Sequence, residues 1–406
     1  MIRAMCNNAS VALSPNAPDP FDLLVVGDGI IGLATALACH DRQPDLRIAL
    51  VGPESRSGGA SQAAAAMLTA LTEVDDRTLQ DERRRAKFEL ARRSVPRWPG
   101  WIARRADAVG LTPPSITPGT VVTVTDPLID GPTLEAIRTA ADLHGVSTET
   151  LEIRDVPGLR PRRTPPEAPA LRIAGEGAVD PIEVLEVLDR AAGAAQVVRM
   201  VDRAVRLEEG NVELASGMVL RSDRVLIANG AHAGGLLHTH PDLAGTIPAI
   251  LFGTGVGIRA KLPAHADVPS EVVRTPNRPD GDGVYFAPHG TGRFYVGATC
   301  DVAAEPRDHP RIAALRRILD AAMNDLSTEL GRAECRPVLG HRPVSADGAP
   351  LLGRATDTVW IATGTHRDGF VSAPEISDLL ARELLSGERR LPRSLRPCRA
   401  ESMARS

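Results

Sequence analysis

The sequence is poor in aromatic residues, in lysine and in long apolar runs. Aromatic residues make up 3% of the 406 residues, and Lys87 and Lys261 are the only lysines. With a formal net charge of −4, the chain has no broad basic field for nucleic acid or an anionic membrane surface. No stretch approaches the roughly 20 apolar residues of a transmembrane helix. We therefore expect a cytoplasmic protein with small-molecule partners, no nucleic acid, no membrane and a possible homo-oligomeric state.

Cysteine pairing and metal binding are also not indicated. The five cysteines are scattered without C-x-x-C spacing, and an odd number argues against a disulfide framework. Because zinc sites need clustered ligands, we predict no metal site. Residues 1–21 lack the continuous apolar segment of a signal peptide and are expected to form a flexible tail.

A strand–turn–helix–strand pattern begins at residue 22 and contains a glycine motif. The segments DLLVVG, GIIGLATALACHD and RIALVG form a unit of about 30 residues. Its turn holds Gly27, Gly29 and Gly32 in G-x-G-x-x-G spacing, which suits a tight turn, close approach of a pyrophosphate and close helix packing. The helix N-terminus would supply free N–H groups. The motif predicts dinucleotide binding, with a structural βα turn as the alternative.

The acid that usually follows this motif is missing. An Asp or Glu is expected at the end of the second strand to bind a ribose hydroxyl, but this chain has Gly52 there. Glu54 is a candidate substitute, and Asp28 is expected to face solvent or a water and not a negatively charged phosphate.

The rest of the chain alternates helical and strand patterns without an internal repeat. An alanine-rich helix start is predicted over 59–71, and a helix over 180–195 with Asp180 as its cap and Pro181 at its first position. A β-meander is predicted over 196–236. Further strands are predicted at 119–126, 254–260, 283–289, 293–299 and 358–364, and further helices at 131–145 and 373–387.

The segment SGGASQAAAAML, residues 57–68, resembles a cofactor-contact segment of the D-amino-acid oxidase superfamily, in its glycine-oxidase-like branch. RVLIANGAHAGGL, LGHRPVSADGAPLLGR and VWIATGTHRDGFVSAPEISDLL follow in the family's order. The resemblance covers residues 22–387. It implies a mixed α/β fold in which a Rossmann-like FAD-binding domain (22–93, 171–244 and 334–391) is interleaved with a substrate-binding domain (94–170 and 245–333). The second domain would be built on a mixed, mostly antiparallel sheet, with 392–406 as a tail.

The resemblance also implies a non-covalent FAD and the residues that hold it. These are Gly27, Gly29, Ile30, Ile31, Gly32, Glu54, Ala60, Ser61, Gln62, Ala65, Ala66, Met67, Val198, Asn229, Gly230, Gly340, Arg342, Arg367, Asp368, Gly369 and Phe370.

Three side chains are expected to act on the substrate. Arg342 matches the family arginine for the substrate carboxylate, which a guanidinium can bind with two hydrogen bonds. Tyr285 matches an aromatic residue over the substrate, and Arg367 a second arginine near the site. The implied activity is an FAD-dependent oxidase of an amino acid or N-substituted amino acid. A hydride would pass from the carbon bearing the amine to flavin N5, giving an imine, and molecular oxygen would be reduced to hydrogen peroxide.

Two departures from the family pattern leave the substrate open. Thr365 stands where relatives have a histidine, which is shifted here to His366, and the segment 251–255 (LFGTG) replaces a polar pair. The alternative is an FAD-dependent dehydrogenase or biosynthetic tailoring enzyme that uses another electron acceptor.

Overall fold

The computed structural model describes residues 19–263, 265–277 and 283–399. The expected tails therefore lie largely outside the described residues, in 1–18 and 400–406. Residues 392–399 differ from a tail, because Leu395 is fully buried and Arg399 forms ion pairs with Asp347. Within the described ranges, no helix has the length and apolar character needed to cross a membrane.

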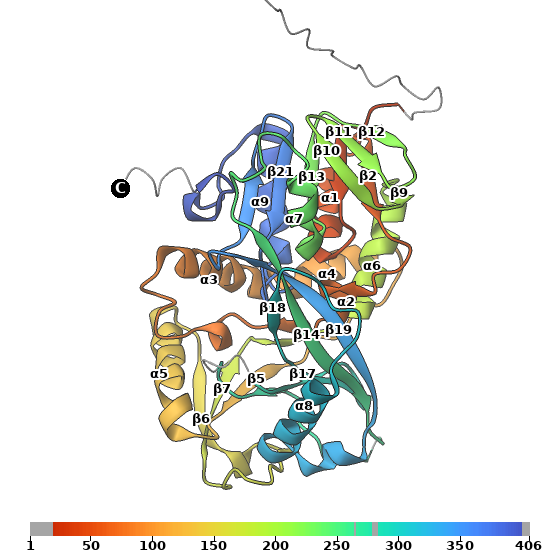
Figure 1. Cartoon of the computed structure of the whole chain (residues 1–406). Helices are drawn as coiled ribbons and strands as arrows, with labels where there is room; N and C mark the ends of the chain where they lie inside the picture. Colours follow the sequence, from red (N-terminus) through yellow and green to blue (C-terminus); the bar gives the residue numbers. More distant parts are fainter. Residues whose placement is uncertain (1–18, 264, 278–282, 400–406) are drawn as a thin grey trace, which may run out of the picture.

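The first half of the fold is a six-stranded, mainly parallel sheet, in the upper lobe of Figure 1. Its order is β20-β21-β13-β1-β2-β9, and only β20 runs antiparallel to its neighbour. The strands are β1 (Leu23–Val26), β2 (Ile48–Gly52), β9 (Val198–Val201), β13 (Val225–Ile227), β20 (Leu351–Arg354) and β21 (Val359–Thr363). The predicted βαβ unit is confirmed, since α1 (Ile30–Arg42) connects β1 to β2.

Both faces of this sheet are covered, because strand side chains point alternately to opposite sides. Leu23 and Val25 face a layer of helices, whereas Leu24 and Val26 face a small antiparallel sheet. The helices are α1, α4 (Trp98–Asp107), α6 (Pro181–Ala194) and α9 (Ala373–Ser386). The other side is covered by α7 (Ala233–Leu237) and by β10 (Ala204–Glu208), β11 (Asn211–Leu214) and β12 (Val219–Arg221). As predicted, Asp180 caps α6 by accepting a hydrogen bond from the Ile182 N–H.

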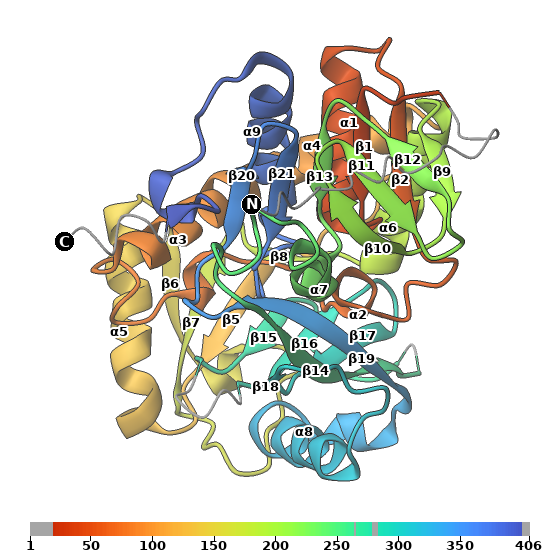
Figure 2. The ribbon, with the colours of Figure 1, turned by 45° about the horizontal axis from the view of Figure 1, so that its top comes forward.

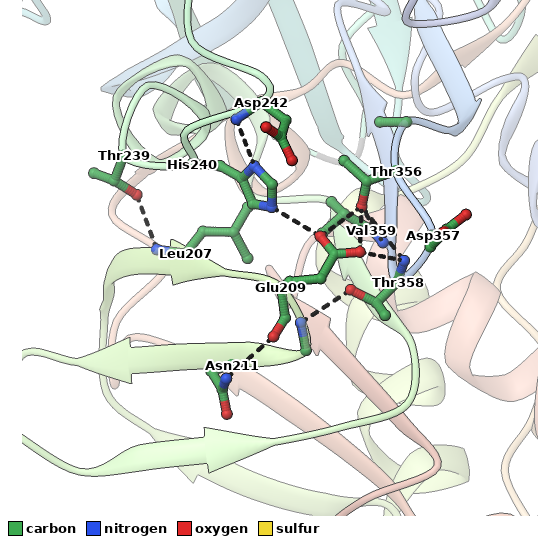
Figure 3. A network of polar contacts seen from close by, with 12 residues as sticks. Leu207, Glu209, Asn211, Thr239, His240, Asp242, Thr356, Asp357, Thr358 and Val359 are labelled. Carbon is green, nitrogen blue, oxygen red and sulfur yellow. Dashed lines mark hydrogen bonds and ion pairs between the residues drawn. The ribbon is translucent and has the colours of Figure 1, made fainter. Parts of the chain in front are cut away.

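A polar network anchors this small sheet, as Figure 3 shows. Glu209, at the β10–β11 turn, accepts hydrogen bonds from His240 Nε2 at 3.0 Å and from the Thr358 N–H at 3.0 Å. The Thr356 hydroxyl also binds the Glu209 carboxylate. Burial acts to raise the pKa of Glu209, but these hydrogen bonds lower it below its ordinary value. The network fixes the β10–β11 turn against the start of β21.

The second half of the fold is a ten-stranded mixed sheet, in the lower lobe of Figure 1. Most of its strand pairs are antiparallel, as expected, with β15–β5 and β3–β19 parallel. The strands are β3 (Gly58–Gly59), β5 (Gly119–Thr123), β6 (Thr148–Glu152), β7 (Pro169–Ala174), β14 (Ile250–Lys261), β15 (Val272–Arg274), β16 (Tyr285–Pro288), β17 (Arg293–Gly297), β18 (Asp301–Ala303) and β19 (Glu334–Ser345). Three helices pack near it: α3 (Glu82–Ser94), α5 (Pro127–Leu143) and α8 (Ile312–Asp325).

The long strands β14 and β19 connect the two halves. They pair along their full length, and Val344 at the end of β19 forms a bridge with Thr365 beyond β21. Figure 2 shows the two strands side by side in the lower half of the molecule, beneath the first sheet. Three expected domain boundaries differ from this arrangement. All of β19 and all of β7, including residues 171–174, belong to the second sheet. In contrast, α4 packs its tryptophans, Trp98 and Trp101, into the helical layer of the first.

Candidate active site

A cavity of about 680 Å³ lies where the two halves meet. One end is formed by the turn after β1 and the end of β2, and the other by strands of the second sheet. Its lining includes residues 26–31, 51–53, 55–67, 202–205, 228–232, 340–343, 362–363 and 365–371, together with Gly255, Tyr285 and Tyr295.

The glycine turn at the first end is sterically enforced. Gly27 has φ +115°, and a Cβ there would lie 2.4 Å from the carbonyl carbon of Ala228. A Cβ on Gly32 would lie 1.8 Å from the Gly27 oxygen. Gly32 therefore packs beneath the turn and does not line the cavity, whereas Gly27 and Gly29 do. The open turn leaves space for a phosphate at the N-terminus of α1.

The alanine-rich segment crosses the cavity mainly as extended chain. The predicted helix start is confirmed only for α2 (Ala60–Ala63), after which Ala64 is extended and Ala66 has φ 49°. Tertiary hydrogen bonds override helix propensity here: the Val179 N–H donates to the Ala66 oxygen, and His289 Nε2 lies 2.8 Å from the Ala65 oxygen. β4 (Met67–Leu68) then pairs with β8 (Gly177–Ala178). Small side chains along this path let the backbone approach a flat ligand closely.

Two polar groups beside the glycine turn fit a dinucleotide. Ser61 Oγ accepts a hydrogen bond of 3.0 Å from the Ile30 N–H, so this hydroxyl sits at the N-terminus of α1. Asn229 Oδ1 is buried and has no hydrogen-bond partner within the described parts of the chain, although Asn229 lines the cavity. The turn and the helix N-terminus fit the pyrophosphate of a dinucleotide, and the Asn229 oxygen offers it an acceptor.

The opposite end of the cavity presents Arg342. Its Nη1 donates to the Thr299 oxygen at 2.9 Å. The guanidinium reaches the cavity over Gly255, because a Cβ on that glycine would lie 2.3 Å from Nη1. Arg342 lines the cavity, and a guanidinium group there can bind a carboxylate.

Two tyrosines lie next to Arg342. Tyr285 and Tyr295 stack with ring centroids 6.0 Å apart and planes at 11°. Two glycines make room for them, since a Cβ on Gly257 would lie 1.9 Å from the Tyr295 hydroxyl and one on Gly297 would lie 3.1 Å from the Tyr285 hydroxyl. Both tyrosines line the cavity.

A charged wall completes this end. Arg274, almost fully buried, donates to Glu73 at 2.5 Å and to the Asn277 side-chain oxygen at 2.8 Å. Arg367 Nη1 donates to the same Asn277 oxygen at 2.8 Å. Burial acts to raise the pKa of Glu73, but the two arginines and Asn277 lower it to about 2. The carboxylate is therefore ionised and compensated.

A second ion pair lies behind this wall. Lys87 Nζ is 2.9 Å from Asp368, whose pKa is raised by burial despite the lysine. Burial, together with Lys87, Arg367 and Arg342, holds the pKa of His366 well below its ordinary value. His366, at φ 51°, places Nε2 3.4 Å from Cys300 Sγ. His366 is thus a neutral side chain on the cavity wall.

The cavity brings together most of the residues expected to contact cofactor or substrate. Apart from Gly32, two do not line it: Glu54 is exposed, and Val198 is 45% exposed on β9. Residues 202–205, at the start of β10, line the cavity in place of Val198. Sequence reasoning missed them because it could not fix where β9 ends. It also missed Glu73, Arg274 and Asn277, which carry no local motif.

The expectation that Asp28 faces solvent is wrong. This side chain is 5% exposed and forms ion pairs with Arg56 at 3.0 Å and with Arg199 at 2.6 Å. The two arginines come from distant segments, so the glycine motif alone gave no indication of them.

Comparisons with known proteins agree with this architecture. The glycine oxidase of Pseudomonas aeruginosa is 31% identical over 173 residues, which cover 41% of this chain and 43% of that protein. The bifunctional protein ThiO/ThiG of Synechocystis sp. is 26% identical over 384 residues, covering 90% of this chain and 52% of that protein. The matched regions thus span about half the length of these curated relatives.

Solved structures show the same fold. The crystal structure of glycine oxidase from Geobacillus kaustophilus superposes with a TM-score of 0.80 at 22% identity, covering 93% of this chain and 98% of that one. The family model described as FAD dependent oxidoreductase (DAO) matches residues 22–383. The expectation of FAD as the cofactor is confirmed by this match: the chain belongs to the DAO family of FAD-dependent oxidoreductases.

Proposed function

We propose that this protein is an FAD-dependent oxidase of an amino acid or N-substituted amino acid, releasing an imine and hydrogen peroxide. The observation that carries the proposal is Arg342, whose guanidinium faces the cavity beside Tyr285 and Tyr295. A carboxylate is the natural ligand of such a fork. The curated relative named glycine oxidase also acts on a substrate of this class.

The first end of the cavity would hold FAD without a covalent bond. Gly27, Gly29 and the N-terminus of α1 would take the pyrophosphate, and Asn229 would offer its free oxygen to the cofactor. Among the described residues that line the cavity there is no cysteine. When bound, FAD accepts the electron pair and the hydrogen removed from the amine-bearing carbon.

The protein's own residues position the substrate. Arg342 would bind the carboxylate and so fix the distance of the amine-bearing carbon from the cofactor. Tyr285 would cover the substrate and exclude water from one side. Arg367, tied to Asn277, would present a second positive charge at the rim, and neutral His366 adds no charge that would repel an amine. Glu73 offsets the charge of only one of the two wall arginines, so with Arg342 this end of the cavity keeps a net positive charge, which favours a carboxylate.

A peroxide-coupled screen tests this function. Purified protein would be supplied with glycine, sarcosine, other N-substituted amino acids and the D and L forms of common amino acids under air. We expect at least one of them to yield hydrogen peroxide in proportion to substrate consumed. Substrate oxidation that requires an added quinone or dye and yields no peroxide would contradict the oxidase assignment. Release of yellow flavin on denaturation tests non-covalent binding.

A further inference from the structure

The acid that normally binds the adenosine ribose is missing from the end of β2, but its space is filled. In dinucleotide-binding βαβ units, that acid accepts hydrogen bonds from ribose hydroxyls. This chain has Gly52 at the position. A Cβ built on Gly52 would lie 2.4 Å from Asp28 Cγ and 2.7 Å from Asp28 Oδ1. The carboxylate of Asp28 therefore lies where a side chain at residue 52 would begin.

Asp28 is part of a balanced four-residue cluster. Its Oδ2 accepts hydrogen bonds from Arg56 Nε at 3.0 Å and from Arg199 Nη2 at 2.6 Å. Arg56 also binds both carboxylate oxygens of Asp189, on α6, at 2.6 Å each. Two positive and two negative charges thus cancel. The balance explains how a carboxylate is tolerated within a turn that must accept phosphates.

The second oxygen of Asp28 is left available. Both hydrogen bonds from the arginines go to Oδ2, and within the described ranges no protein group donates to Oδ1. Asp28, Gly52 and Arg56 line the cavity at its adenosine end, whereas Glu54 is exposed and does not. The arginines hold the carboxylate in one orientation, so Oδ1 is presented without the entropy cost of ordering a free side chain.

We propose that Asp28 Oδ1 accepts a hydrogen bond from a hydroxyl of the adenosine ribose of FAD, in place of the missing acid at residue 52. This arrangement requires glycine at residue 52, because any side chain there would displace Asp28. This inference rests on FAD being the cofactor and is independent of which amine is oxidised, so a failed substrate screen would leave it intact.

A thermodynamic cycle that combines substitution of Asp28 with removal of one ribose hydroxyl from the ligand tests the contact directly. Full-length apoprotein would be titrated with FAD and with analogues that lack the 2′- or 3′-hydroxyl of the adenosine ribose, and Kd read from quenching of flavin fluorescence. A hydrogen bond to a charged group predicts that one analogue binds the unmodified protein about tenfold to a hundredfold more weakly than FAD. In Asp28→Ala the same analogue should bind within about twofold of FAD, since the partner is gone.

Two controls separate ribose binding from a structural role. Asp189→Ala disrupts the same ion-pair cluster, yet it should retain the full penalty for the missing hydroxyl. FMN, which lacks the adenosine, should bind Asp28→Ala and the unmodified protein equally. An undiminished penalty in Asp28→Ala, or a parallel loss of FMN and FAD affinity, overturns the proposal. If Asp28→Ala does not fold, Asp28→Asn decides the matter, because a neutral amide oxygen accepts a weaker hydrogen bond than a carboxylate: a clearly smaller hydroxyl penalty than in the unmodified protein supports the proposal, and an unchanged penalty overturns it.

Discussion

Gly255 and Arg342 lie on adjacent strands, and the bare backbone of the glycine forms the surface over which the guanidinium reaches the cavity. A methyl group on Gly255 would lie 2.3 Å from Arg342 Nη1 and 2.7 Å from Cζ. The conformation of the proposed carboxylate-binding residue thus depends on the absence of a side chain on the neighbouring strand.

Gly255→Ala should therefore weaken substrate binding. The new methyl group displaces the guanidinium, and loss of one charge-assisted contact lowers kcat/KM by about tenfold to a hundredfold, mainly through KM. Steady-state kinetics on whichever amino acid the screen identifies would measure this. Gly193→Ala, on α6 with nothing within 4 Å of the added methyl, serves as the control. An unchanged KM in Gly255→Ala would show that Arg342 does not contact substrate.

Arg274 should be a strong contributor to stability. It is 2% exposed and binds Glu73 at 2.5 Å, so Arg274→Met leaves a buried carboxylate with much less compensation. Breaking a buried ion pair in this way costs about 3 to 5 kcal/mol. Urea denaturation with a fixed concentration of FAD measures the change. Arg316→Met removes an arginine that is 82% exposed in its pair with Asp320, and it should cost under about 1 kcal/mol. Similar losses in the two variants would refute this assignment.

The contribution of Glu176 to the stability of the protein should fall as the pH rises from about 4.5 toward neutrality. Burial raises the pKa of Glu176 from 4.5 to about 7, although the Ala70 and Leu71 N–H groups oppose this shift. Between these two pH values the folded state keeps a proton that the unfolded chain has released, so stability decreases with increasing pH. The difference amounts to about 3 kcal/mol.

Glu176→Gln should remove this dependence. The amide keeps an oxygen for the two N–H donors and does not titrate. The free energy of unfolding of the unmodified protein, relative to that of the variant, should therefore fall by about 3 kcal/mol between pH 4.5 and 8. Free energies of unfolding at several pH values test this, with exposed Glu54→Gln as the control. Parallel pH profiles for the unmodified protein and Glu176→Gln would contradict the assignment.

Gly27→Ala should abolish cofactor retention. At φ +115°, an alanine is strained, and its Cβ would lie 2.4 Å from the backbone of Ala228. We expect the variant to purify with little flavin, as judged by the absorbance ratio of flavin to protein. Gly131→Ala, which meets nothing within 4 Å, should retain a full complement. Normal flavin content in Gly27→Ala would mean that the turn does not cradle the cofactor.

Patterns among residues that are close in sequence were sufficient to predict much of the fold. The βαβ unit follows from a strand, a glycine turn and a helix in direct succession, and the cap at Asp180 depends on the next two residues. The alanine-rich segment shows the opposite case. Its helix ends at Ala63, because hydrogen bonds from Val179 and His289, more than 100 residues away, hold the extended chain.

The charged parts of the candidate site could not be predicted for the same reason. Asp28 looked solvent-facing because Arg56 and Arg199 reach it only in the folded chain. The wall of Glu73, Arg274 and Asn277 likewise joins two segments about 200 residues apart. Arg342 was predictable only through the family resemblance, since nothing in its immediate sequence distinguishes it from the other arginines.

The most direct test of the account compares amino acids with the matching amines that lack the carboxylate, in the unmodified protein and in Arg342→Ala. Peroxide formation under air gives kcat/KM for each substrate. We predict that the unmodified protein prefers the carboxylated substrate by at least about tenfold, and that Arg342→Ala loses most of this preference while retaining bound FAD. Equal rates on both substrates in the unmodified protein, or a preference that survives in Arg342→Ala, would contradict the proposed function.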